Sequence, residues 1–551
     1  MKKLFLLALI LLSCRMFAQS EDVPVEHKVY DYLSRLNVRH IVTGYSAFEA
    51  PFSRSLIAHY LKQAADNSGM LDESDLKTLS DLQKEFEFDI YGTTEHQQAL
   101  FTGHRYNVLE QDPKHLYYYI EPGVGNIWVD FYAEGNYLAL SKNGYKNNST
   151  IGIVGGEIYG SLFDKFGFYI HSTDGNTWGN RDVAMHLKQL KYNWNLKNTP
   201  DNAFFDETRG YCTADFGALK IKLGRDRVLL GYGPNKLIMS DNAPEADFIS
   251  FKIRLGSLEY STFHGKLVGI RSDSMDVVQG QITTVAEKYL VYHRISFAAS
   301  KYTKVSVGET VVYADRGLDL SYFNPISFLK TLEHSNQDRD NSMLFFDFSN
   351  TSFTGWKFYG IALIDDISFS KVGSGWYGNQ IALQLGMTTS FLYKIFPAEF
   401  NLDYFHVEPY VFTHRLIANN YTSDGYAIGL DTDPNSSIMC GKVNYRPSSR
   451  LTCTLQYAYR VHGANPVDPI TGAVLKNVGG DISLGHREVD DKYLRFMEGN
   501  KEIYRKLGVT ARYELFVGTF FNLTISNQTN SLQNSGHKNE WFYTLGGWTR
   551  L

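Results

Sequence analysis

The sequence has no long hydrophobic run of the kind found in helical membrane proteins. Beyond its first twenty residues, the 551-residue chain has no stretch that approaches the roughly 18–20 consecutive apolar residues a helix needs to cross a bilayer. A protein that spans a membrane with helices is therefore excluded.

Cysteine is also scarce. The chain has four cysteines, and Cys212, Cys440 and Cys453 show no paired spacing, so we expect no disulfide framework. Cys440 and Cys453 are either neighbours across one hairpin or two apolar thiols on a lipid-facing surface.

The usual catalytic motifs are missing as well. The sequence contains no G-x-S-x-G, H-E-x-x-H, G-x-x-x-x-G-K-[ST] or C-x-x-C pattern, and we predict no enzyme and no cofactor. Two acidic runs, at residues 336–340 and 431–435, have oxygen ligands at calcium-like spacing. Both lack the glycine and the final glutamate of an EF-hand, which favours solvated loops and no metal. His264 and His293, on neighbouring candidate strands, leave a barrel hydrolase as a minor alternative.

A basic block is absent too. The formal net charge is −5, which argues against a nucleic-acid partner. Aromatic residues, in contrast, make up 15% of the chain. Such a high content is typical of strands with tyrosine and tryptophan girdles at membrane interfaces.

The first 18 residues have the pattern of a secretory signal peptide. Lys2 and Lys3 precede an apolar stretch at residues 4–12, and cleavage is expected after Ala18. The residues before Cys14 resemble a lipobox, so lipoprotein processing is the alternative. Either interpretation predicts that the chain is exported.

Residues 19–95 are predicted to be helical. Val25, Val29, Leu33 and Leu36 recur at helical spacing. Further helices are expected after an N-cap at Ser53 and after Asp72 or Ser74. We expect a small helical bundle at the periplasmic mouth of the domain that follows.

Residues 96–551 are predicted to form an outer-membrane β-barrel. Residues 437–445 and 450–460 are two runs with alternating polarity joined by a tight turn. Eight tight turns of this kind alternate with long polar segments, near residues 164–166, 216–218, 255–257, 300–303, 353–356, 395–398, 447–449 and 515–518. With one strand before and one after these hairpins, the pattern predicts about 18 antiparallel strands with both ends on one side. The alternative is a soluble all-β array or propeller.

Three segments combine residue types that suit ligand binding. Residues 171–179 are expected to leave a strand as a loop, where Asp174, Asn176 and Trp178, with His171, are the residue types that sugars prefer. An aromatic ring covers the C–H face of the sugar, and carboxylate and amide groups bind its hydroxyls. The alternative is a structural turn with a tryptophan at the membrane interface. Residues 223–244 suggest a loop folded back on the barrel, with polysaccharide-binding candidates Arg225, Arg227, Tyr232, Asp241 and Asn242. The two arginines bind an acidic polysaccharide or pair with carboxylates to tie the loop down. The third segment runs from Gly308 to Asn341. Here Glu309 is interpreted as a barrel-interior charge and Asn324-Pro325 as a fixed turn.

Taken together, these residues resemble the capsule assembly Wzi family of outer-membrane proteins, in a member of the Bacteroidetes type. The shared elements occur in order, and the most specific are a Gly-Arg strand end and the loop after it. They are Gly224-Arg225, Tyr232-Gly233-Pro234, Met239-Ser240-Asp241-Asn242-Ala243-Pro244, His293-Arg294, Gly308-Glu309 and Asn324-Pro325. Asn235 stands where the family has a second loop glycine, and Tyr232 where tryptophan is common.

The resemblance implies an eighteen-stranded barrel with a periplasmic helical bundle. It further implies a monomer, held in outer-membrane lipid, that binds and anchors or organises capsular or other surface polysaccharide, like a lectin. The alternative is an outer-membrane channel for a small solute. Long loops such as residues 461–502 argue instead for a plugged lumen.

Overall fold

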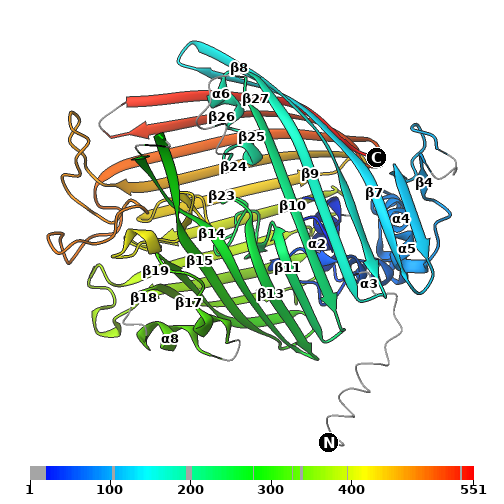
Figure 1. The fold of residues 1–551 in the computed structure, drawn as a ribbon, viewed down its shortest axis with the longest axis horizontal. Coiled ribbons are helices and arrows are strands. Elements are labelled where there is room, and N and C mark those ends of the chain that lie inside the picture. Colours follow the sequence, from blue (N-terminus) through cyan, green and yellow to red (C-terminus); the bar gives the residue numbers. More distant parts are fainter. Residues whose placement is uncertain are drawn as a thin grey trace, which may run out of the picture.

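The computed structural model describes residues 20–101, 106–193, 196, 202–276, 278, 280–324, 327–335, 339–393, 395–533 and 536–551. The predicted signal peptide, residues 1–18, lies outside the described residues. The described residues form an N-terminal segment and a large barrel (Figure 1).

The N-terminal segment, residues 20–91, contains four helices. The N-caps predicted at Ser53 and Asp72 are present: each side chain accepts a hydrogen bond from a backbone N–H in the first turn. The apolar faces of the helices form one core, with Leu33, Leu61 and Leu82 fully buried. The helices are α2 (Lys28–Val38), α3 (Arg54–Asp66), α4 (Glu73–Glu85) and α5 (Glu87–Tyr91).

Eighteen antiparallel strands form the closed barrel in the described part of the chain, as predicted. The barrel closes where β27 pairs with β7, and the short β6 (Tyr117–Glu121) extends the seam by pairing with the start of β7. The strands are β7 (Gly125–Lys142), β8 (Tyr145–Leu162), β9 (Phe166–Gly179), β10 (Phe204–Asp215), β11 (Leu219–Asp226), β13 (Ala246–Leu255), β14 (Leu258–Asp276), β15 (Gly280–Ala298), β16 (Thr303–Ala314), β17 (Asn341–Asn350), β18 (Trp356–Asp366), β19 (Gln380–Thr389), β20 (Ala398–Val407), β23 (Ser436–Tyr445), β24 (Leu451–Ala464), β25 (Asn500–Phe516), β26 (Thr519–Leu532) and β27 (Gly536–Arg550).

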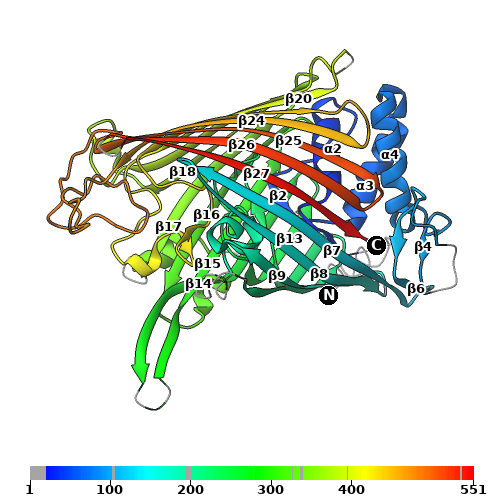
Figure 2. The ribbon, with the colours of Figure 1, turned by 90° about the horizontal axis from the view of Figure 1, so that it is seen from above.

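All eight predicted tight turns lie at one end of the barrel, here called the short-turn end. The opposite loop end is less uniform than predicted. It has six long connections, but the hairpins β7–β8, β14–β15 and β26–β27 are also closed there by short ones. Although its connection is short, the β14–β15 hairpin is long, and its tip projects beyond the neighbouring strands (Figure 2).

Small elements occupy the connections and the lumen. The two-stranded pairs are β1 (Asp22–Val23) with β3 (Phe52–Ser53), β2 (Glu49–Ala50) with β12 (Leu229–Leu230), β4 (Gln98–Ala99) with β5 (Lys114–His115), and β21 (Thr422–Ser423) with β22 (Tyr426–Ala427). The short helices are η1 (Ser68–Met70), α6 (Arg181–Ala184), η2 (Lys188–Leu190), η3 (Leu320–Phe323), α8 (Leu329–Ser335), η4 (Phe369–Lys371) and η5 (Ile417–Asn419).

The wall of the barrel is apolar outside. On β27, Trp541, Tyr543 and Leu545 point outward and are exposed, and Leu523 and Ile525 do the same on β26. A closed barrel with such a surface is an outer-membrane β-barrel, because water would not tolerate an apolar belt of this size. None of the helices in the described residues is long and apolar enough to cross a membrane. Cys212, Cys440 and Cys453 are free.

The N-terminal segment fills the short-turn mouth (Figures 1 and 2). Lys28 binds Glu514 of β25 at 2.7 Å, and Asp22 binds Lys220 and Lys222 of β11. These ion pairs tie the segment to strands far apart around the barrel. Its core therefore abuts the inner wall, and both the segment and the C-terminal end of β27 lie at the short-turn end.

Candidate functional site

The loop between β11 and β13, residues 227–245, turns into the lumen, and we call it the inner loop. Its strand β12 pairs with β2 of the N-terminal segment, and the N–H of Gly231 donates to the carbonyl oxygen of Phe48 at 2.8 Å. The lumen is thus occupied by two segments that reach in from opposite ends and pair with each other. The predicted folded-back loop is confirmed.

Glu49 is the polar centre of this contact. Its carboxylate accepts hydrogen bonds from Ser261 at 2.5 Å and Tyr292 at 2.9 Å, and forms an ion pair with Lys252 at 2.7 Å. Arg294 donates to it at 3.4 Å. Burial alone would raise the pKa of Glu49, but Lys252 and Arg294 outweigh burial and lower it, so Glu49 is ionised.

Arg294 joins both inserted segments to the wall. Its guanidinium forms a two-pronged ion pair with Asp347 at 2.8 and 2.9 Å and lies 3.8 Å from the centre of the Phe48 ring. Tyr232 of the inner loop donates to the same Asp347 at 2.8 Å. Arg294 is part of the sequence motif that resembles the Wzi family. Glu49 and Asp347 belong to no recognisable motif, because they are far apart in the sequence and only the fold brings them together.

The candidates on the inner loop, and Arg225 on β11 just before it, are engaged in contacts within the protein. Arg225 pairs with Asp247 at 2.6 Å, and Arg227 pairs with Glu26 at 2.6 Å and with Glu245. The remaining contacts hold the inner loop to its neighbours. Tyr232 is buried beside Asp347, Asp241 pairs with Lys188 at 2.6 Å, and Asn242 accepts from Lys191 at 2.7 Å and donates to the carbonyl oxygen of Ala427 at 3.1 Å.

The candidates at residues 171–179 lie elsewhere. The predicted loop is wrong here, because β9 continues as a strand to Gly179, paired throughout with β8. Asp174, Asn176 and Trp178 alternate on its outward face and are exposed. The inward positions are Thr173, Gly175 and Thr177. The barrel wall therefore separates these candidates from those of the inner loop, whereas Arg225 of β11 faces outward as they do, on the same face as the exposed Leu223.

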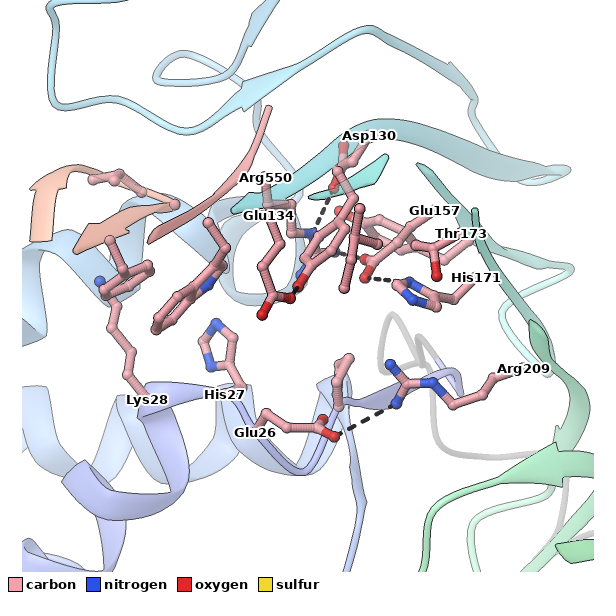
Figure 3. A pocket seen from close by; sticks show the side chains of 18 of the residues that line it. Glu26, His27, Lys28, Asp130, Glu134, Glu157, His171, Thr173, Arg209 and Arg550 are labelled. Carbon is pink, nitrogen blue, oxygen red and sulfur yellow. Dashed lines mark hydrogen bonds and ion pairs between the residues drawn. The ribbon is translucent and has the colours of Figure 1, made fainter. Parts of the chain in front are cut away.

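A cavity of about 380 Å³ lies inside the wall of β7–β10 and β25–β27, beside the N-terminal segment. Figure 3 shows Glu26, His27, Glu134, His171 and Arg209 around it. Most of its charges are paired: Arg550 with Asp130 and Glu157, each at 2.9 Å, and His171 with Glu157 at 3.1 Å. Tyr132, Phe205 and Trp548 add aromatic surface. Such a lining suits an uncharged ligand with hydroxyl groups, or water.

At the loop end, two long connections join and present aromatic rings. Trp376 of the β18–β19 loop forms a β-bridge with Tyr493 of the β24–β25 loop, and the N–H of Leu494 donates to the carbonyl oxygen of Gly375 at 2.7 Å. Lys371 lies 4.1 Å from the centre of the Trp376 ring. Tyr493 is exposed. We call Trp376 and Tyr493 the loop platform. Sequence reasoning missed it, although the flanking Gly373 and Gly375 mark a tight backbone.

His264, which was considered for catalysis, and Glu309, which lies opposite His293 in register, have structural partners. His264 Nε2 lies 2.9 Å from the Tyr313 hydroxyl, and Glu309 accepts from the backbone N–H of Lys330 at 3.1 Å. The interpretation of Glu309 as an interior charge is wrong, since it shares the outward face of β16 with the exposed Val305. Within the described residues, no group of three His, Cys, Asp or Glu side chains is placed to hold a metal.

Comparison with known proteins gives a match in fold. No protein-family model matches the sequence, and no curated protein matches it. The chain is similar to Escherichia coli Wzi, an outer-membrane protein involved in group 1 capsule assembly and described as a carbohydrate-binding β-barrel. The TM-score is 0.54 at 12% identity, covering 95% of this chain and 99% of Wzi.

Weaker similarity extends to two barrels of Pseudomonas aeruginosa. OccK8 (OprE) has a TM-score of 0.45 at 12% identity, covering 77% of this chain and 98% of its own. OprD has a TM-score of 0.41 at 10% identity, covering 77% and 95%. The resemblance to Wzi expected from the motifs is thus confirmed for the fold.

Proposed function

We propose that this protein is a surface polysaccharide-binding barrel, which anchors or organises capsular or related glycan on the outer membrane. The observation that carries the proposal is the pairing of the inner loop with the N-terminal segment inside the lumen. A barrel occupied from both ends is built for a task at its surface rather than for free passage of solutes.

The orientation follows from the unequal ends of the barrel. In outer-membrane barrels short turns face the periplasm and long loops face the outside. We therefore place the N-terminal segment in the periplasmic mouth and the loop platform on the cell surface. The carbohydrate binding described for Wzi, which has the same fold, supports a glycan as the ligand.

We assign the glycan contact to the loop end. Trp376 and Tyr493 offer ring faces to the C–H face of a sugar, and Asp491 and Lys476, which pair with each other at 2.9 Å, lie in the same β24–β25 loop. Asp241 is the inner-loop candidate on this side, since it is accessible beside Lys188. The outward-facing Asp174, Asn176 and Trp178 on β9 form a second candidate contact.

The proposal predicts that purified protein binds polysaccharide extracted from the surface of its own host. Replacing Trp376 and Tyr493 together by alanine should weaken binding at least about tenfold, because central aromatic contacts carry much of a binding energy. Trp541→Ala, on the lipid-facing wall of β27, is the matched control and should bind normally. Surface plasmon resonance measures all three proteins.

Deletion of the gene should release surface polysaccharide into the medium, and complementation should restore its retention. Normal retention in the deletion strain, together with no binding of the extracted polysaccharide, would refute the proposal.

A solute channel is the second candidate, favoured by the cavity beside the N-terminal segment. Single-channel recording in planar bilayers separates the two functions. Large steady currents from the intact protein would establish a channel, while their absence supports the occupied lumen.

A further inference from the structure

Polar side chains occupy the outer wall of the barrel where lipid is expected. His293 of β15 shares its face with the exposed Ile295 and Phe297, and it lies opposite Glu309 of β16 in register. Glu309 lies in the middle of β16, and a strand crosses the hydrocarbon in about 9–11 residues. These groups are therefore within the span of the membrane, where a polar group cannot face lipid without a partner.

The connection between β16 and β17 covers them. We call its described residues 315–324 and 327–335 the outer strap. Tyr313 accepts from the backbone N–H of Asp319 at 3.2 Å, and the ring of Phe323 lies 4.1 Å from that of His264. Together with the hydrogen bond from Lys330 to Glu309, these contacts fasten the strap against the outside of the wall.

Apolar packing completes the attachment. Tyr322 and Leu329 of the strap are buried in one cluster with Tyr289, Val291 and Val311, whose side chains share the outward faces of β15 and β16. Helix α8 lies beside β17 towards the loop end (Figure 1). The strap therefore lies on the lipid side of the barrel and leaves the lumen to the inner loop.

The free side of the strap is apolar. Leu320 is 76% exposed, and Leu318 and Phe328 are each 52% exposed. The guanidinium of Arg316 is turned to Asp340 and Asp319, at 2.6 and 3.2 Å. This apolar surface continues the belt formed by Ile295, Phe297, Val305 and Phe346 on the strands below it.

We propose that the outer strap is embedded in the outer leaflet of the membrane, with Leu318, Leu320 and Phe328 among lipid acyl chains. The strap replaces the wall of β14–β17 as the lipid contact and hides the polar groups beneath it. The proposal rests on the location in the outer membrane and is independent of the polysaccharide ligand.

Site-specific fluorescence quenching tests the proposal. In a background where the native cysteines are replaced by alanine, Leu320→Cys and Phe328→Cys are labelled with bimane. The refolded proteins are then placed in phosphatidylcholine vesicles with brominated acyl chains. Phe346→Cys, on the outward face of β17, is the lipid-exposed control. Val489→Cys, 86% exposed in the β24–β25 loop, is the water-exposed control.

We expect bromine to quench the probes at 320 and 328 at least half as strongly as the probe at 346, and most strongly with bromine near the headgroup. Quenching no greater than at 489 would overturn the proposal. Heat-modified migration on gels confirms that each labelled barrel is folded, so a misfolded variant is recognised before it is measured.

Discussion

Single buried charges determine how the N-terminal segment is held. Glu21 and Asp22 are adjacent and both buried at the short-turn mouth, yet their surroundings differ. Burial raises the pKa of Glu21 to about 7, although Arg54 opposes the shift. Burial acts on Asp22 as well, but Lys220 and Lys222 outweigh it and lower its pKa.

The docking of the segment should therefore weaken as the pH rises. The pKa of Glu21 in the folded protein lies above its ordinary value of 4.5. The contribution of Glu21 to the free energy of unfolding is therefore complete below pH 4.5 and is lost as the pH rises through about 7. Glu21→Gln should remove this loss and stabilise the protein at pH 8 by up to about 3 kcal/mol. The pH dependence of stability is measured by thermal unfolding between pH 5 and pH 8, followed by heat-modified migration on gels.

Asp22→Asn is the matched control with the opposite sign. It should destabilise the protein across the same pH range, because Lys220 and Lys222 lose their shared partner. A Glu21→Gln variant that keeps the pH dependence of the wild type would contradict the assignment.

At the scale of elements, short sequence patterns predicted the helix caps and the tight turns correctly. Ser53 and Asp72 cap their helices, and the tight turns fall where alternating runs meet, because caps and turns depend on a few neighbouring residues. The strand at 171–179 was missed because Asp174, Gly175 and Asn176 are turn-forming residues, while pairing with β8 and β10 holds them extended.

The lumenal contacts could not be predicted in the same way. The Glu49 cluster joins residues more than two hundred positions apart, and no spacing in the chain encodes such a distance. The inner loop could be predicted because Gly231, Gly233 and Pro234 are turn-forming residues close together in the sequence. Its partner in the N-terminal segment has no comparable pattern.

Gly233 is the position in the inner loop where a side chain is least tolerable. Its φ is +68°, and a Cβ there would lie 2.6 Å from a carboxylate oxygen of Asp403 and 2.8 Å from the Tyr359 hydroxyl. Gly233→Ala should therefore destabilise the folded barrel by at least about 2 kcal/mol. Gly441→Ala on β23, where a Cβ meets nothing within 4 Å, should change stability far less. Equal urea midpoints for the two variants would show that the inner loop is loosely held.

At the scale of the whole molecule, the barrel is sealed by mutual contact of parts from both ends. The inner loop also holds the β20–β23 loop, since Ser240 donates to the carbonyl oxygen of Gly429 at 2.6 Å. The largest apolar cluster in the lumen is one core that includes Phe48, Tyr232 and Ile428, and so joins the N-terminal segment, the inner loop and the β20–β23 loop. Removal of the inner loop should therefore weaken the attachment of both the N-terminal segment and the β20–β23 loop.

Replacing residues 229–243, which include β12, by a short Gly-Ser linker should open the lumen. We expect single-channel conductance in planar bilayers to rise several-fold over the intact protein, since the N-terminal segment then lacks its partner strand. Shortening the loop at residues 467–475, which lies outside the lumenal contact, is the control and should leave the conductance unchanged. Equal currents from all three proteins would mean that the N-terminal segment seals the barrel alone.

The seam between β7 and β27 sets an order of events during assembly. It joins the first and the last barrel strand, so it cannot form until the whole chain has been made. We expect the N-terminal segment to be seated before the seam closes, because its partners lie on strands far apart around the interior, from Lys222 of β11 to Glu514 of β25. We therefore expect the strands of the wall to assemble around the N-terminal segment, and the β7–β27 seam to enclose it when it forms.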